Sequence, residues 1–149
     1  MSTFKTQFVI LLISVLFVSC KKDKVAPLTK DVLTGSWEEV PQKAYSRRLL
    51  FEAGGKFTMQ IRNNTNTDWD LILNGKYSIS GTDLSVIITE QLEKQASGQL
   101  VKTAVNNFSL FDKGKFNIKN FVLTINYKSY PADAPVDTEA KFNKLIPID

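Results

Sequence analysis

Residues 56–62 read KFTMQIR, and their polar and apolar side chains alternate without a break. Phe57, Met59 and Ile61 fall on one side of an extended chain, and the residues between them are charged or polar. A period of two predicts a β-strand with one buried face and one solvated face. The same alternation recurs in three other stretches, at residues 69–73, 84–88 and 121–128.

Turn signals separate the strands that this period predicts. Asn74-Gly75 has two interpretations, a type I′ hairpin turn or a bulge inside one long bent strand that runs from Trp69 to Ile79. Residues 129–138 contain two Pro and two Asp, which is typical of a loop at the mouth of a barrel or sandwich. Three shorter turns are expected at AGG, SGTD and DKGK, residues 53–55, 80–83 and 112–115.

About eight strands at even spacing indicate an all-β antiparallel barrel or sandwich. An up-and-down barrel is the favoured architecture, because a sheet that closes on itself has no exposed edges to protect. The 149 residues suit one domain with one core. A barrel of about eight strands leaves interior room for side chains or for one small ligand.

The amino-terminal stretch has the features of an export signal. Lys5 is followed by an apolar run of eleven residues, Phe8–Val18, which Ser14 alone interrupts. That run is too short for a membrane span of about 20 residues and has the length of a signal-peptide core. The stretch FVSC at residues 17–20 resembles the signal of bacterial lipoproteins, in which a small residue precedes a Cys that is lipidated and becomes the new amino terminus. An ordinary secretory signal and an uncleaved anchor are the alternatives.

This resemblance implies three parts: a signal peptide at residues 1–19, the lipidated Cys20 with a basic tether at residues 20–30, and a barrel domain at residues 31–149. Lipid chains such as palmitate on Cys20 would hold the protein at a membrane, because each buried CH₂ contributes about 0.8 kcal/mol. The expected location is the bacterial cell envelope, at the outer membrane and facing the periplasm. Acidic residues directly after the Cys would resemble the surface-export signal of some bacterial lipoproteins, but Lys dominates residues 21–24, which favours the periplasmic side.

The composition excludes several kinds of catalytic site. The chain has no His and one Cys, so a Ser-His-Asp or Cys-His nucleophile, a His-ligated zinc and an internal disulfide are ruled out. Five of the 19 basic residues and one of the 15 acidic residues lie within residues 1–30, which leaves 14 of each for residues 31–149. The basic excess therefore belongs to the leader and tether and does not indicate an anionic partner. We expect no enzyme activity, no cofactor, no metal and no nucleic-acid partner.

Several segments behind the lipoprotein signal resemble one known family. The barrel domain opens with Gly35-Ser36-Trp37. Four further stretches follow in order: LLFEAGGKF at residues 49–57, GKYSISGTDL at 75–84, FVLTI at 121–125 and KFNKL at 141–145. Together they resemble the lipocalin-like (calycin-like) domains of Bacteroidetes lipoproteins.

The family resemblance implies a packing arrangement at the closed end of the barrel. Trp37, two residues after Gly35, should pack there, and a basic residue of the last strand should lie across its ring. Lys144 is the nearest match to that basic residue, where Arg is usual, and a Lys can still form a cation–π contact. A second lipocalin motif of the Thr-Asp-Tyr kind is missing from the sequence, so the resemblance implies the fold rather than ligand transport.

The inward-facing apolar side chains form the candidate ligand site. They would line a cavity for a small apolar molecule such as a lipid fragment, or they would simply fill the core. The candidate cavity residues are Phe57, Met59, Trp69, Leu71, Tyr77, Leu123 and Tyr127.

Two sets of polar residues could be either functional sites or ordinary structural features. Arg47 and Arg48 are adjacent and point to opposite faces of a regular strand, so one of them could meet a ligand carboxylate or form an internal ion pair with Glu38 or Glu39. The ion pair is the favoured interpretation. Asn64, Asn66, Asp68 and Asp70 alternate, as calcium ligands would, but a polar hairpin tip is the simpler account.

Two functions are consistent with these features. The first is a membrane-anchored envelope lipoprotein whose lipocalin-like barrel binds a small apolar ligand. The second is a packed barrel that acts as an interaction module or inhibitor subunit for another envelope protein.

Overall fold

The computed structural model describes residues 32–63, 65, 68–132 and 134–146, so the predicted signal peptide, Cys20 and the tether lie outside the described residues. Within the described part, no helix is long and apolar enough to cross a lipid bilayer. The elements are the short 3-10 turn η2 (Ala53–Gly55) and the strands β1 (Gly35–Val40), β2 (Tyr45–Glu52), β3 (Lys56–Asn63), β4 (Leu71–Ser80), β5 (Asp83–Lys94), β6 (Leu100–Ser109), β7 (Asp112–Lys119), β8 (Val122–Ser129) and β9 (Val136–Leu145).

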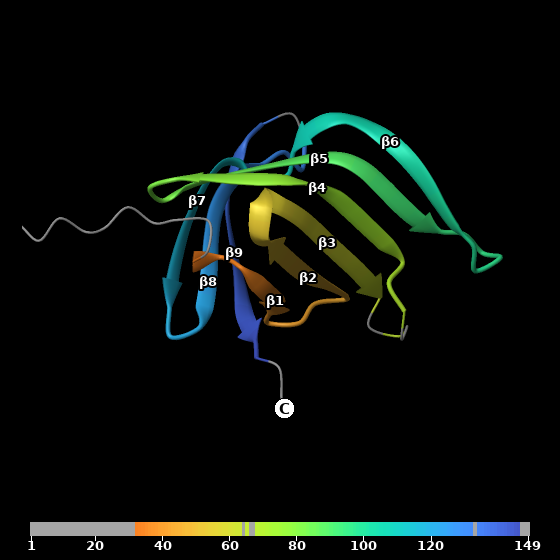
Figure 1. The fold of residues 1–149 in the computed structure, drawn as a ribbon, viewed down its shortest axis with the longest axis horizontal. Coiled ribbons are helices and arrows are strands. Elements are labelled where there is room, and N and C mark those ends of the chain that lie inside the picture. Colours follow the sequence, from red (N-terminus) through yellow and green to blue (C-terminus); the bar gives the residue numbers. More distant parts are fainter. Residues whose placement is uncertain (1–31, 64, 66–67, 133, 147–149) are drawn as a thin grey trace, which may run out of the picture.

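Eight of these strands close into an antiparallel barrel, which confirms the predicted fold class (Figure 1). The ring runs β1-β2-β3-β4-β5-β7-β8-β9, and β9 pairs back to β1. The ninth strand, β6, pairs with β5 alone among the described strands and arches along the upper right of the view. One edge of β5 therefore meets β4, and its other edge meets β7 and then β6.

The register brings apolar side chains of neighbouring strands to the same level inside the barrel. Trp37 lies opposite Leu49, Leu49 opposite Met59, and Met59 opposite Leu73. All four side chains are at most 6% exposed, and they belong to one continuous core. The period of two in the sequence thus becomes a layer of buried side chains, because alternate residues of every strand point inward.

Gly75 lies at a bulge inside β4, not in a turn. β4 runs unbroken through Asn74-Gly75, and the pairing with β5 shifts there, because Asn74 lies opposite Glu90 while Gly75 lies opposite Ile88. A Cβ atom on Gly75 would lie 2.0 Å from the backbone oxygen of Ile87. The interpretation as one long bent strand is therefore confirmed, and the glycine is required by the close approach of the two backbones.

Two other predicted turns differ from the structure. The stretch at residues 112–115 forms the start of β7, where a bulge takes the place of a turn and Lys113 has a positive φ of 52°. The loop predicted at residues 129–138 is shorter, because Ser129 already pairs with Val136. Bulges and strand ends depend on partner strands, so local turn composition alone misplaces them.

Trp37 packs at the barrel end where β1 begins, which we call the closed end. The indole N–H donates a hydrogen bond to the backbone oxygen of Leu33 at 2.8 Å. Lys144 Nζ lies 5.2 Å from the centre of the Trp37 ring, within cation–π range. Gly35 leaves room for this Lys, because a Cβ there would lie 3.3 Å from its Cε. The three residues named by the family resemblance therefore lie together.

Replacing Gly75 by Ala should destabilise the barrel by about 3 kcal/mol, because the new methyl group overlaps the β5 backbone and forces the strands apart. Urea unfolding followed by Trp fluorescence measures the change. Gly98→Asn is the matched control: Gly98 has a φ of +83° and open space around its Cα, and Asn tolerates that backbone conformation. Equal stabilities of the two variants would contradict the role given to Gly75.

Candidate functional site

Four of the seven predicted cavity residues lie in the filled core. Phe57, Met59, Tyr77 and Leu123 are 0–3% exposed, so no ligand-sized space opens against them. The ring of Phe51 packs edge to face on Phe57 and on Tyr77, with centroid distances of 5.1 and 5.0 Å. Aromatic side chains therefore occupy the volume that the cavity hypothesis assigns to a ligand.

Leu71 and Tyr127 lie nearer the barrel end that carries the β1–β2 connection, which we call the open end, and they are only partly buried against the core. Tyr127 packs edge to face on Phe111 at 5.1 Å. The packed interior therefore ends at about the level of these two residues.

The prediction that Trp69 points into the barrel is wrong. Its ring lies between the guanidinium groups of Arg48 and Arg62, at 4.9 and 5.0 Å from their central carbons. Arg48 lies opposite Glu38 and points away from the core layer, so the indole covers the outer wall. The alternation failed here because β4 begins only at Leu71, and a residue in the preceding connection has no fixed face.

The open end of the barrel contains a buried ion pair. Glu39, on β1, is 3% exposed, and its carboxylate accepts two hydrogen bonds from Arg47 of β2, at 2.7 Å from Nε and 2.5 Å from Nη2. The guanidinium also lies 5.7 Å from the ring centre of Phe142. The predicted internal ion pair is confirmed, and Arg48 faces the opposite way, 3.6 Å from Glu38.

The charges of this pair stabilise each other. Burial alone would raise the pKa of Glu39, but the hydrogen bonds and charges of Arg47 and Lys43 outweigh it and hold the pKa below its ordinary value. The hydrogen bond from Arg47 to Glu39 raises the pKa of the guanidinium in spite of desolvation, and Tyr127 adds a smaller contribution in the same direction. Both groups are therefore ionised at neutral pH.

A hollow of about 340 Å³ lies above the ion pair. Its charged wall consists of Glu39, Arg47 and Lys43, whose Nζ lies 3.2 Å from a Glu39 oxygen. Two cations therefore face one carboxylate, so the hollow has one positive charge in excess. The rest of its lining is largely apolar and comprises Ala44, Tyr45 and Ile61. We call this hollow the mouth site.

Three lining residues of the mouth site escaped the sequence analysis. Lys43 and Ala44 lie in the connection between β1 and β2, where no periodicity fixes a side-chain direction. Tyr45 begins β2 and is 57% exposed. One signal in the sequence could have indicated these residues, namely that they lie close to Arg47, a candidate inward Arg. A short connection between paired strands lies at the end of the barrel, so its residues are near any inward side chain at that end.

The alternating Asn and Asp residues before β4 were the alternative candidates for a calcium site, and the structure describes only two of the four. Asn64 and Asn66 lie outside the described residues. Asp70 accepts a hydrogen bond from the backbone N–H of Asn63 at 2.7 Å, and Asp68 forms an ion pair with Lys94 at 2.9 Å. Both carboxylates thus bind groups of the chain itself, as expected at the tip of a polar hairpin.

Comparison with known proteins leaves the geometry as the guide to function. No known family, no curated protein and no solved structure matches this chain. The features of the chain that bear on function are the mouth site, the filled core and the surface of the barrel.

Arg47→Met should lower the free energy of unfolding by about 3 kcal/mol at pH 7, because it leaves the Glu39 carboxylate buried beside Lys43 alone. Urea unfolding against Arg48→Met provides the comparison. Arg48 is 30% exposed on the outer wall, and its loss should cost less than about 1 kcal/mol.

The cost of Arg47→Met should also depend on pH. The pKa of Glu39 lies below its ordinary value of 4.5 in the folded chain, so its ion pair stabilises the fold fully above that pH. This contribution is lost as the pH falls through the lowered pKa, and the difference between wild type and variant should shrink. A difference that stays constant from pH 7 to pH 3 would show that the ion pair is not its source.

Proposed function

We propose that this chain is a bacterial envelope lipoprotein, anchored through a lipid on Cys20, whose barrel binds a small amphipathic molecule at the mouth site. The observation that carries the proposal is the pairing of an apolar wall with excess positive charge in one hollow of about 340 Å³. The filled core limits the ligand to the barrel end. A molecule with a short apolar chain and one anionic head group fits these constraints.

The head group would meet Lys43 and the outer side of the Arg47 guanidinium. Lys43 is 62% exposed and is held near the hollow by its contact with Glu39. An Arg has five N–H donors, and the bidentate contact with Glu39 uses two of its nitrogen atoms. A carboxylate of the ligand would restore charge balance in the hollow, while Tyr45 and Ile61 would cover its apolar chain.

The outer edge of β6 supports a second candidate, the interaction module. Nine of the ten residues of β6 are exposed, and they include Leu100, Val101 and Phe108. The strand has no Pro or Gly and a single charged residue, Lys102, so it lacks the features that usually protect an edge. An extended, apolar segment of another envelope protein could add to this edge as a further strand.

A titration with 6-(dansylamino)hexanoic acid, a fluorescent carboxylic acid with a short chain, separates the two candidates. A soluble form that begins at Lys21 should enhance the dansyl emission, with energy transfer from Trp. Lys43→Glu should weaken binding roughly tenfold, because it replaces an attractive charge by a repulsive one, and tenfold corresponds to about 1.4 kcal/mol.

Lys56→Glu is the matched control for this titration, because Lys56 is an exposed Lys at the opposite end of β3. It should leave the affinity unchanged. The ligand hypothesis is rejected if wild type does not bind, or if both substitutions weaken binding equally; the β6 edge then becomes the leading candidate.

Lipidation has a test of its own. Cells that express the full chain and are fed an alkyne analogue of palmitate should label the protein at Cys20. Cys20→Ser should lose the label and accumulate the unprocessed precursor, whereas Ser19→Ala, which keeps a small residue before the Cys, should retain it. Label that persists in Cys20→Ser would exclude this anchor.

A further inference from the structure

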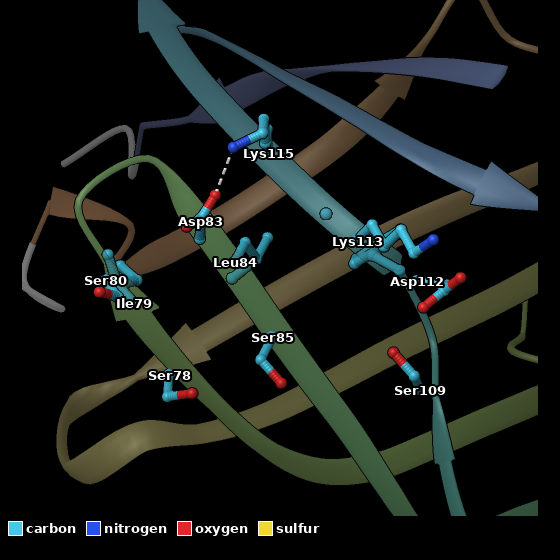
Figure 2. Close-up of a pocket in the computed structure, with 12 residues that line it drawn as sticks. Ser78, Ile79, Ser80, Asp83, Leu84, Ser85, Ser109, Asp112, Lys113 and Lys115 are labelled. Carbon is cyan, nitrogen blue, oxygen red and sulfur yellow. Dashed lines mark hydrogen bonds and ion pairs between the residues drawn. The ribbon is translucent and has the colours of Figure 1, made fainter.

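A second hollow lies on the outer wall of the barrel, where β5 changes its neighbour from β6 to β7 (Figure 2). Its volume is about 510 Å³. Four serines from three strands line it: Ser78, Ser80, Ser85 and Ser109. We call it the serine hollow, and it is separate from the mouth site because the two share no lining residue.

The hollow exists because small side chains lie beside large ones. Ser78 lies directly opposite Ser85 across the β4–β5 pair, so two small residues adjoin on the outer face. The backbone of β7 approaches β5 closely: a Cβ on Gly114 would lie 2.7 Å from the backbone oxygen of Leu84. The long side chains of Lys113 and Lys115, on either side of Gly114, border the hollow on the β7 side and form its rim.

The charges around the hollow balance. Asp83, Asp112, Lys113 and Lys115 all line the hollow, which gives two carboxylates and two ammonium groups. Lys115 and Asp83 are joined by an ion pair of 2.6 Å, drawn in Figure 2. An anion would meet as much repulsion as attraction here, and so would a cation. A neutral ligand rich in donors and acceptors matches such a lining, because Ser hydroxyls both donate and accept hydrogen bonds.

An exposed aromatic ring stands beside the rim. The hydroxyl of Tyr130 donates a hydrogen bond to Asp112 at 2.7 Å, and the residue is 58% exposed. This bond places the Tyr130 hydroxyl at Asp112, a residue that lines the hollow. An exposed ring with one polar end is suited to a ligand that has both C–H faces and hydroxyl groups.

We infer that the serine hollow binds a neutral saccharide. The serine hydroxyls and the rim carboxylates and ammonium groups bind the sugar hydroxyls, and the Tyr130 ring covers a C–H face of the sugar. The size fits, because small-molecule sites commonly measure about 300–1,000 Å³. This inference does not depend on the mouth site or on the lipid anchor.

Saturation-transfer-difference NMR tests it with the full-length chain in lauryldimethylamine oxide micelles, a detergent without sugar groups. The probes are chitotetraose and maltotetraose. At least one should receive saturation from the wild type. Ser85→Val, which fills the hollow with a residue that strands accept, should reduce the signal at least fivefold. Tyr130→Ser, in the connection between β8 and β9, should reduce it without disturbing the barrel.

Thr103→Val on β6 is the matched control, since Thr103 is an exposed strand residue outside the hollow, and it should keep the full signal. The inference is overturned if neither saccharide gives a signal with wild type, or if the signal survives both Ser85→Val and Tyr130→Ser. A ³¹P shift of inorganic phosphate that Ser85→Val abolishes, in the absence of a saccharide signal, would likewise overturn it in favour of an anion site.

Discussion

The backbone of β5 forms hydrogen bonds with three neighbouring strands, and the arrangement of the strands on this side of the barrel depends on that pairing. Along one edge it pairs with β4 between Asp83 and Glu93, and along the other it pairs with β7 at Asp83 and with β6 from Ile87 onward. Backbone N–H and C=O groups need hydrogen-bond partners, and β6 supplies them along the part of β5 that runs beyond β7. The bulge at Gly75, the arched β6 and the hollow beside β7 are the structural results.

The core determines where another molecule can bind. Aromatic and aliphatic side chains fill the barrel from Trp37 at the closed end up to Phe142, and the Glu39–Arg47 pair lies above them. A buried ion pair of this kind needs both partners, because either charge alone would be costly in a poorly hydrated interior. It therefore forms a polar boundary, and the sites left for ligands are the barrel end and the outer wall.

The two hollows differ in their electrostatics, although both lie at places where strands diverge. The mouth site has three charged groups that do not balance, together with an apolar wall. The serine hollow has four that do balance, together with four hydroxyl-bearing side chains. Excess charge favours a ligand with a complementary charge, whereas a balanced set of donors and acceptors favours a neutral one. One small barrel thus presents two chemically distinct surfaces.

Local periodicity was enough to predict the all-β barrel, the strands around residues 56–62 and 121–128, and the opposite directions of Arg47 and Arg48, because side-chain direction alternates within any regular strand. The turn chemistry of Asn74-Gly75 left two interpretations, a hairpin turn or a bulge. The choice between them came from the β5 backbone, which a Cβ on Gly75 would meet. Trp69 and Lys43 lie outside regular strands, and Ser78, Ser85 and Ser109 become neighbours only through pairing. Such contacts between distant segments leave no local pattern, so they emerge only when the barrel closes.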